Sequence, residues 1–234
     1  MDIFMILLTA LLPIALLVYY IYHKDKKSPE PTGQLVKAFL FGILSVPVSF
    51  YISIPLGIIG LYPVEATSIL GSISTAFFGA AIPEEIAKFI MLWLLLRNNP
   101  YFDEKMDGIV YAVCVSLGFA ALENIMYLFS NAESYLSVGI ARAIFAVPGH
   151  FCFGILMGYY YSLAKFYPKT PKKNKALILV APILVHGVYD SILFIINVTP
   201  AISGILLIIF LVFCHKMWKY GSKSIQEHLK RDLC

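Results

Sequence analysis

The sequence is short of charged residues. Asp, Glu, Lys and Arg make up only 14% of its 234 residues, whereas 59% are apolar. Soluble domains carry about 25% charged residues. The low charge, together with a mean hydropathy of +0.80, therefore excludes a soluble protein. The composition predicts an all-α integral membrane protein. Residues 1–234 fit a single polytopic domain and leave no room for a separate soluble module.

Cysteine is also scarce, and its four occurrences, Cys114, Cys152, Cys214 and Cys234, include no CxxC pair. Disulfides and a thiolate metal site are therefore not expected. The net charge of +4 comes from basic residues in short loops beside apolar runs, which is not the pattern of a nucleic-acid-binding protein. A basic N-terminal segment and a small-x-small cleavage signal are lacking as well. The first apolar run is thus expected to remain as a helix.

Long apolar runs are abundant, and they predict about seven transmembrane helices. A crossing of about 30 Å of hydrocarbon needs about 20 helical residues. The run 66–96 is too long for a simple crossing, and Pro83 predicts a bend or a re-entry within it. The run 176–214 must hold two helices, with a turn at 197–200. The predicted spans are 3–22, 34–60, 66–96, 108–129, 138–165 and the two halves of 176–214.

The orientation of these spans follows from the basic residues, which occupy alternate loops. Of the 18 Lys and Arg residues, only Lys88 and Arg142 lie within spans. The others lie in or beside the first, third and fifth loops and in the C-terminal tail. Since cytoplasmic loops are rich in Lys and Arg, the N-terminus is predicted outside and the C-terminus in the cytoplasm. We expect a multi-pass protein of the cell membrane, surrounded by the lipid bilayer.

Ionisable residues within the spans fall at one predicted depth. At about 1.5 Å per residue from the cytoplasmic end of each span, they reach heights of about 16 to 24 Å. Four predicted helices thus bring such groups to one layer, at or beyond the midplane toward the outside. Charges at this depth are costly and mark functional sites. The residues counted in this way are Glu85, Glu123, His150, His186 and Asp190.

Local spacing couples some of these groups. Glu84 and Glu85 lie four and three residues before Lys88, so the lysine can neutralise one of them on the same helix. His186 and Asp190 are also four residues apart, a spacing that suits two metal ligands or a ligand histidine with an orienting carboxylate.

Charge balance in this layer leaves two hypotheses open. The four carboxylates of Glu84, Glu85, Glu123 and Asp190 are balanced only in part by two cationic side chains. Either a divalent cation supplies the remainder, or some carboxyl groups are protonated. Imidazole and carboxylate ligands suit Zn²⁺ with an open position for water, and a neighbouring glutamate can act as general base. This is the chemistry of a metallohydrolase.

Four motifs in order carry a resemblance to a known family. They are EExxK from Glu84 to Lys88, FxxxEN from Phe119 to Asn124, His150 in the fifth span, and HxxxD from His186 to Asp190. Together they resemble the PrsW family of intramembrane metalloproteases, over a motif core at 83–190. The CAAX prenyl-protein proteases are a more distant likeness. Their pattern is EExxxR, FxxxH and HxxxN, and this chain departs from it at each motif.

The resemblance implies a peptidase that performs site-1 cleavage of a single-span anti-sigma factor. Such cleavage would activate an extracytoplasmic-function sigma factor in a stress response. We expect one Zn²⁺ held by His150, His186 and either Glu123 or Asp190. Glu84 or Glu85 would be the general base, and the other would pair with Lys88. Asn124 and Arg142 are expected to support this site.

Other functions remain as alternatives. A metal-free protease would use Glu84 to activate water directly, with His186 stabilising the oxyanion. An ion- or proton-coupled transporter could also hold carboxylates and histidines at this depth, but it would predict inverted repeats, which the sequence lacks. A CAAX-type prenyl-protein processing protease is a third alternative.

Overall fold

The computed structural model describes residues 3–167 and 171–232, and this part of the chain is helical without a strand. The all-α prediction is therefore confirmed. The elements are α1 (Ile3–Lys24), α2 (Thr32–Ile58), α3 (Ile69–Ser74), η1 (Thr75–Ala81), α4 (Ile82–Leu96), α5 (Lys105–Ser130), α6 (Tyr135–Ala141), η2 (Arg142–Ala146), α7 (Val147–Phe166), α8 (Pro171–Val198), η3 (Pro200–Ile202) and α9 (Ser203–Arg231).

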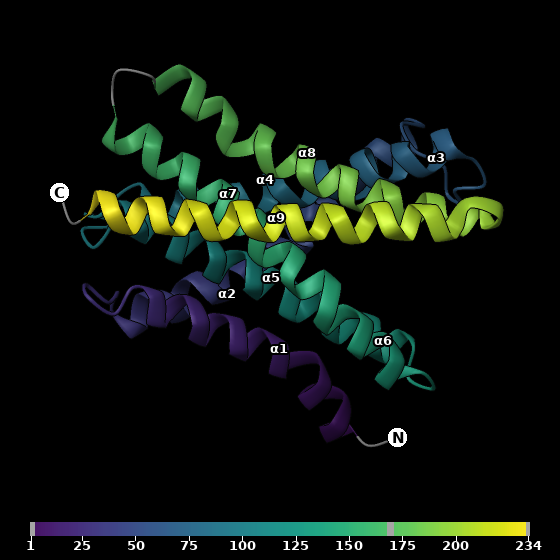
Figure 1. Ribbon diagram of the computed structural model, residues 1–234, viewed down its shortest axis with the longest axis horizontal. Helices are drawn as coiled ribbons and strands as arrows, with labels where there is room; N and C mark the ends of the chain where they lie inside the picture. The colour runs from purple at the N-terminus through teal and green to yellow at the C-terminus, as the bar shows by residue number, and fades with distance from the viewer. Residues whose placement is uncertain (1–2, 168–170, 233–234) are drawn as a thin grey trace.

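Six helical stretches of the described chain are long and apolar enough to cross a membrane. The remaining predicted span is the continuous helical path α3–η1–α4, from Ile69 to Leu96, whose three charged residues lower its hydropathy. Figure 1 shows that α1 begins toward the end of the long axis opposite to the one at which α9 ends. That all seven stretches cross a membrane remains a prediction. Which end faces the cytoplasm remains a prediction.

The interruption expected at Pro83 takes the form of a π-helical segment. The N–H of Ile82 bonds the carbonyl of Phe77, five residues back, and Pro83 then occupies the first turn of α4. The η2 segment does the same before α7, where the N–H of Val147 bonds the carbonyl of Arg142. Pro83 has no N–H to donate, and the carbonyl of Gly79, four residues before it, instead accepts from the Ser53 hydroxyl at 2.9 Å, so the helical path continues past the proline. Single π turns are frequent at functional sites.

Helix α5 is the centre of the bundle, packed closely against both α2 and α7. A Cβ added to Gly42 or Gly118 would strike the backbone of the facing helix, and one added to Gly158 would strike the backbone of α5. Small residues at helix crossings allow this close approach in membranes. These contacts fix α5 between α2 and α7, and they therefore also fix the position of Glu123.

The last helix extends beyond the predicted end of the last span at Cys214. Helix α9 continues without a break to Arg231 and lies across one face of the bundle (Figure 1). Its C-terminal half packs on α7, where the ring of His228 stacks on Tyr159 at 4.5 Å. Five of the 17 residues at 215–231 are Lys or Arg, which lowers the hydropathy of this half.

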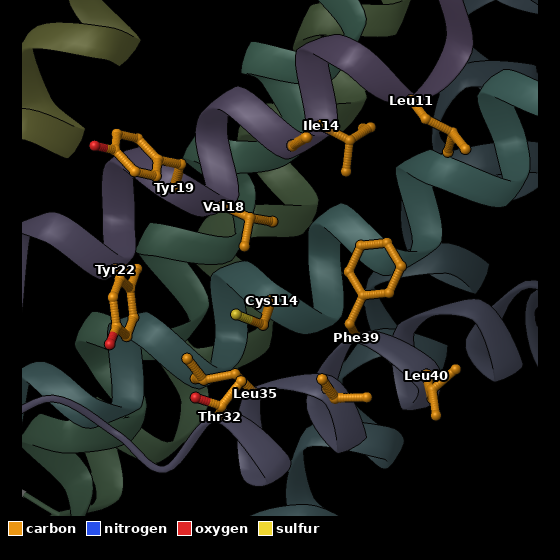
Figure 2. A pocket seen from close by; sticks show the side chains of 12 residues that line it. Leu11, Ile14, Val18, Tyr19, Tyr22, Thr32, Leu35, Phe39, Leu40 and Cys114 are labelled. Atoms are coloured by element: carbon orange, nitrogen blue, oxygen red, sulfur yellow. The ribbon is translucent and has the colours of Figure 1, made fainter. Parts of the chain in front are cut away.

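An apolar groove of about 690 Å³ lies between α1 and α2, with Cys114 of α5 on its floor. Figure 2 shows Leu11 and Val18 of α1 facing Phe39 and other residues of α2 across it. No carboxylate, histidine or lysine lines this groove. Its titratable side chains among the described residues are Tyr19, Tyr22 and Cys114, and none of the motif residues lines it, so the site must be sought elsewhere.

Candidate functional site

The layer predicted from the sequence is a physical cluster in the structure. Helices α4, α5, α7 and α8 and the segment η2 each contribute to it, and each member contacts another. The π segments η1 and η2 end just before Glu84 and His150, respectively. The cluster consists of Glu84, Glu85, Lys88, Glu123, Asn124, Arg142, His150, His186 and Asp190.

Lys88 is the hub of the cluster. Its Nζ lies 2.8 Å from Glu85 Oε1, 3.3 Å from Glu84 Oε2 and 3.2 Å from His150 Nδ1. The ammonium also sits over the ring of Phe119, 4.1 Å from its centroid, a favourable cation–π contact. An ammonium can only donate hydrogen bonds, so His150 Nδ1 must be the acceptor.

The tautomer of His150 follows from this contact. With Nδ1 accepting from Lys88, the proton of a neutral ring resides on Nε2, which donates to Glu123 Oε2 at 2.9 Å. On α7 itself, the carbonyl of His150 accepts a hydrogen bond from the Ser116 hydroxyl at 2.6 Å. Both the ring and the backbone of His150 are thus oriented by α4 and α5.

Glu84 and Glu85 have different surroundings although they are adjacent. The Glu85 side chain has no exposed surface, whereas that of Glu84 is 14% exposed. Glu85 Oε1 contacts both Lys88 Nζ and His186 Nδ1, the latter at 2.9 Å. Glu85 is therefore held in a buried ion-pair network, and Glu84 is the carboxylate that can meet another molecule.

His186 is held on three sides. Its Nδ1 faces Glu85, and its Nε2 lies 3.2 Å from Asp190 Oδ2 on the same helix. The ring of Phe153 stacks on it at 4.5 Å. The four-residue spacing of His186 and Asp190 thus produces the contact that the sequence predicts.

Glu123 is held by a chain of contacts that reaches α1. Arg142 Nη2 lies 2.5 Å from Glu123 Oε2, and Arg142 Nε donates to Asn124 Oδ1 at 2.6 Å. Asn124 Nδ2 in turn donates to the carbonyl of Ala10 at 3.1 Å. The guanidinium also lies over the ring of Tyr127, 4.1 Å from its centroid. Asn124 and Arg142, which are expected to support the site, therefore hold the Glu123 side chain through these contacts.

The sequence interpretation missed several residues that shape the site: Ser116, Phe119, Tyr127 and Phe153. Helical spacing offered a signal for two of them, because Phe119 and Tyr127 lie four residues before and after Glu123, on the same face. Ser116 and Phe153 carry no such signal, since their roles depend on how α5, α7 and α8 pack.

Two cavities meet at the cluster. One, of about 410 Å³, extends from Glu84 and Glu123 toward Val46 and Phe50 of α2. The other, of about 280 Å³, extends toward His150, His186 and Asp190. Both are lined by Ala80, Glu84, Glu123 and Tyr127. The two carboxylates thus stand where the cavities adjoin, accessible from either side.

The donor groups suit a metal ion. Ligand atoms of Glu84, Glu123 and His150 lie within 4.8 Å of one another, as do those of Glu84, Glu85 and His186. Glu85 Oε2 is buried without a hydrogen-bond partner in the described chain, which leaves one ligand atom unsatisfied. Glu84 belongs to both groups. In the described residues, neither group joins the two histidines, and neither includes Asp190.

Comparison with known proteins gives a consistent result. The PrsW family intramembrane metalloprotease model matches residues 30–216. Protease PrsW of Clostridioides difficile (strain 630) is 36% identical over 99% of this chain and 93% of its own length. Protease PrsW of Bacillus subtilis (strain 168) is 33% identical over 96% and 95%, and that of Geobacillus kaustophilus (strain HTA426) is 38% identical over 77% and 75%. No solved structure matches the chain.

Proposed function

The chain belongs to the PrsW family of intramembrane metalloproteases, and from this premise we propose that it cleaves a single-span membrane protein. The substrate would be an anti-sigma factor cut at site 1, which would activate an extracytoplasmic-function sigma factor. The predicted depth of the motif layer, at or beyond the midplane toward the outside, supports a cut on the extracytoplasmic side of the membrane-spanning segment.

The observation that carries this proposal is the junction of the two cavities at Glu84 and Glu123. A peptide bond can be hydrolysed only where a chain passes a group that activates water. Together the cavities form a path past the carboxylates, lined by apolar side chains such as Phe50 on one side and Leu193 on the other. An extended segment of a substrate could lie along this path with its scissile bond beside Glu84.

Within this path we assign Glu84 as the general base. It borders both cavities, and its contact with Lys88 is longer than that of Glu85. A base must reach the proton that it removes, and geometry decides this before acidity does. Glu85 instead fixes Lys88 and His186. Lys88 then orients both Glu84 and the ring of His150.

We further propose that the metal is one Zn²⁺, held by Glu123 or Asp190 with His150 and His186. A bound Zn²⁺ would supply Lewis-acid activation of water and of the scissile carbonyl. Imidazole and carboxylate donors are the ligands that this ion prefers, and the unpaired Glu85 Oε2 is a further donor beside His186. Because each close group of ligand atoms holds only one of the two histidines, binding of one ion by both requires their side chains to move together. The protein's part is to orient these donors and to move the proton through Glu84.

The test is co-expression with candidate single-span membrane proteins, comparing the wild-type chain with Glu84→Gln. We expect the wild type to release a shorter fragment whose new terminus, mapped by mass spectrometry, lies on the extracytoplasmic side of the substrate's span. The variant should release none. Fragment release by Glu84→Gln at the wild-type rate would refute the assignment, and a cut on the cytoplasmic side would refute site-1 cleavage.

A further inference from the structure

A second group of carboxylates lies at the opposite end of α5 from Glu123. Carboxylate oxygens of Asp25, Glu104 and Asp107 lie within 4.8 Å of one another. Glu30 lies beside them, because its negative charge raises the pKa of both Asp25 and Asp107, and its carboxylate accepts from the hydroxyl of Tyr111. Two of these acidic residues come from the α1–α2 connection, and two come from the start of α5.

Helix capping accounts for only part of the group. Asp107 Oδ2 accepts from the backbone N–H groups of Asp103 and Glu104 at 3.0 and 2.6 Å, and the Glu104 side chain accepts in return from the N–H of Asp107. This capping box explains both acidic residues of α5. It does not explain Asp25 and Glu30, which reach the same place from another segment.

The buried side chain of Asp25 indicates that a ligand binds at this group. The residue is only 3% exposed, and its Oδ2 is buried without a hydrogen-bond partner in the described chain. Leaving a buried carboxylate oxygen unsatisfied is costly, and such atoms are rare in folded proteins. Because Asp25 contributes one of the three mutually close ligand atoms, a cation beside the carboxylates of Glu104 and Asp107 would satisfy it.

The protein supplies no cation to this group. In residues 3–167 and 171–232, no Lys, Arg or His nitrogen lies within 4.0 Å of the four carboxylates, and Lys105 is paired with Asp232 instead. Burial, together with the negative charges of Glu30 and Glu104, raises the pKa of Asp25 to about 7. Burial raises the pKa of Glu30 as well.

We propose that Asp25, Glu30, Glu104 and Asp107 bind one hard divalent cation, Ca²⁺ or Mg²⁺. A set of oxygen ligands alone suits these ions. Two oxygens on opposite sides of a Ca²⁺ ion, each about 2.4 Å from it, are about 4.8 Å apart, so the observed spacing is within reach of one ion. The bound cation fastens the α1–α2 connection to the start of α5, far from the proteolytic cluster and independently of what that cluster cleaves.

The test uses the full-length chain in detergent, carrying Glu84→Gln so that the proteolytic cluster is weakened as a metal site. After chelator treatment, Ca²⁺ alone or Mg²⁺ alone is added at pH 8 and at constant ionic strength. Thermal unfolding and titration calorimetry are then recorded. We expect one ion per chain and a transition temperature raised by several degrees, because an ion that binds only the folded state stabilises it.

Two variants make the test specific. Asp25→Asn should weaken binding at least about tenfold, yet it should unfold at a higher temperature than its parent in the absence of the cation, since a repelling charge is removed. The matched control Asp103→Asn alters an exposed carboxylate and should bind like the parent. An absence of cation-dependent stabilisation in the parent would overturn the proposal and leave protonation as the means of neutralising the cluster. An undiminished response of Asp25→Asn would overturn it as well.

Discussion

Glu85 of α4 and His186 of α8 are joined by a contact of 2.9 Å between Oε1 and Nδ1. The same oxygen also contacts Lys88 Nζ at 2.8 Å. Of two adjacent glutamates, one is therefore committed to holding helices together, and the other is free to act at the cavities. Substitutions at the two glutamates should therefore have different effects on stability and on cleavage.

The variants Glu84→Gln and Glu85→Gln should both lose activity, but they should differ in stability. Glu84→Gln should lower the cleavage rate about 100-fold or more, as expected for loss of a general base, while the protein remains stable. Glu85→Gln should also lose activity, but it should unfold at a clearly lower temperature, because Lys88 loses its buried partner. Cleavage assays and thermal unfolding in detergent distinguish the two. Equal stability losses would contradict the assignment.

Lys88→Met should destabilise the protein by about 3 kcal/mol, because the buried carboxylate of Glu85 loses its cationic partner and keeps only its contact with His186. The double variant Glu85→Gln/Lys88→Met removes both charges and should recover most of that stability without recovering cleavage. A double-mutant cycle of unfolding free energies measures the coupling between the two side chains. Additive effects would show that the contact of 2.8 Å contributes no coupling energy.

Asn124→Ala should lower the cleavage rate although Asn124 lies outside the cavities. Arg142 would lose the acceptor for its Nε and hold Glu123 less firmly. The effect should appear in kcat more than in KM, since orientation and not substrate contact is lost. The matched control is Asn197→Ala, which alters an exposed asparagine near the end of α8 that lines neither cavity. Equal rates for the two variants would remove Asn124 from the positioning chain.

Metal dependence is tested by elemental analysis of the purified chain before and after chelator treatment. We expect one Zn²⁺ per chain, loss of cleavage on its removal, and recovery when Zn²⁺ is returned. His150→Ala and His186→Ala should each contain much less zinc. Cleavage by a protein shown to hold no metal would instead favour direct activation of water by Glu84.

The orientation in the membrane is tested by single cysteines in a variant without native ones. Lys26→Cys and Glu65→Cys are both exposed, in the α1–α2 and α2–α3 connections. With the cytoplasmic C-terminus that the basic loops predict, an impermeant maleimide added to intact cells should label position 65 and not position 26. The reverse pattern would invert the proposed side of cleavage.

Much of the site could be predicted from the sequence because charge is so costly in hydrocarbon. Each ionisable group within a span had to have a partner, and Glu84, Glu123, His150 and His186 do meet. The hydropathy pattern likewise located the long helices. Side-chain directions could not be predicted in this way, because adjacent helical residues point about 100° apart and only packing decides which one faces the cavity.

Packing also explains the parts that the sequence did not reveal. Pro83 predicted an interruption before α4, but its form as a π segment, and the matching segment before α7, could not be predicted from the sequence. The contact of Ser116 with the carbonyl of His150 depends on the close approach of α5 and α7 at glycines such as Gly154. The acidic group at Asp25 joins segments about 80 residues apart in sequence, so the group cannot be predicted from either segment alone.

The central claim is that Glu84 activates water for hydrolysis of a membrane-spanning substrate. The most direct measurement is the cleavage rate of one purified single-span substrate, reconstituted in liposomes with the wild-type chain, with Glu84→Gln or with Asn197→Ala. We expect cleavage by the wild type and by Asn197→Ala, and at most about 1% of that rate for Glu84→Gln. Cleavage by Glu84→Gln at a rate near that of the wild type would contradict it.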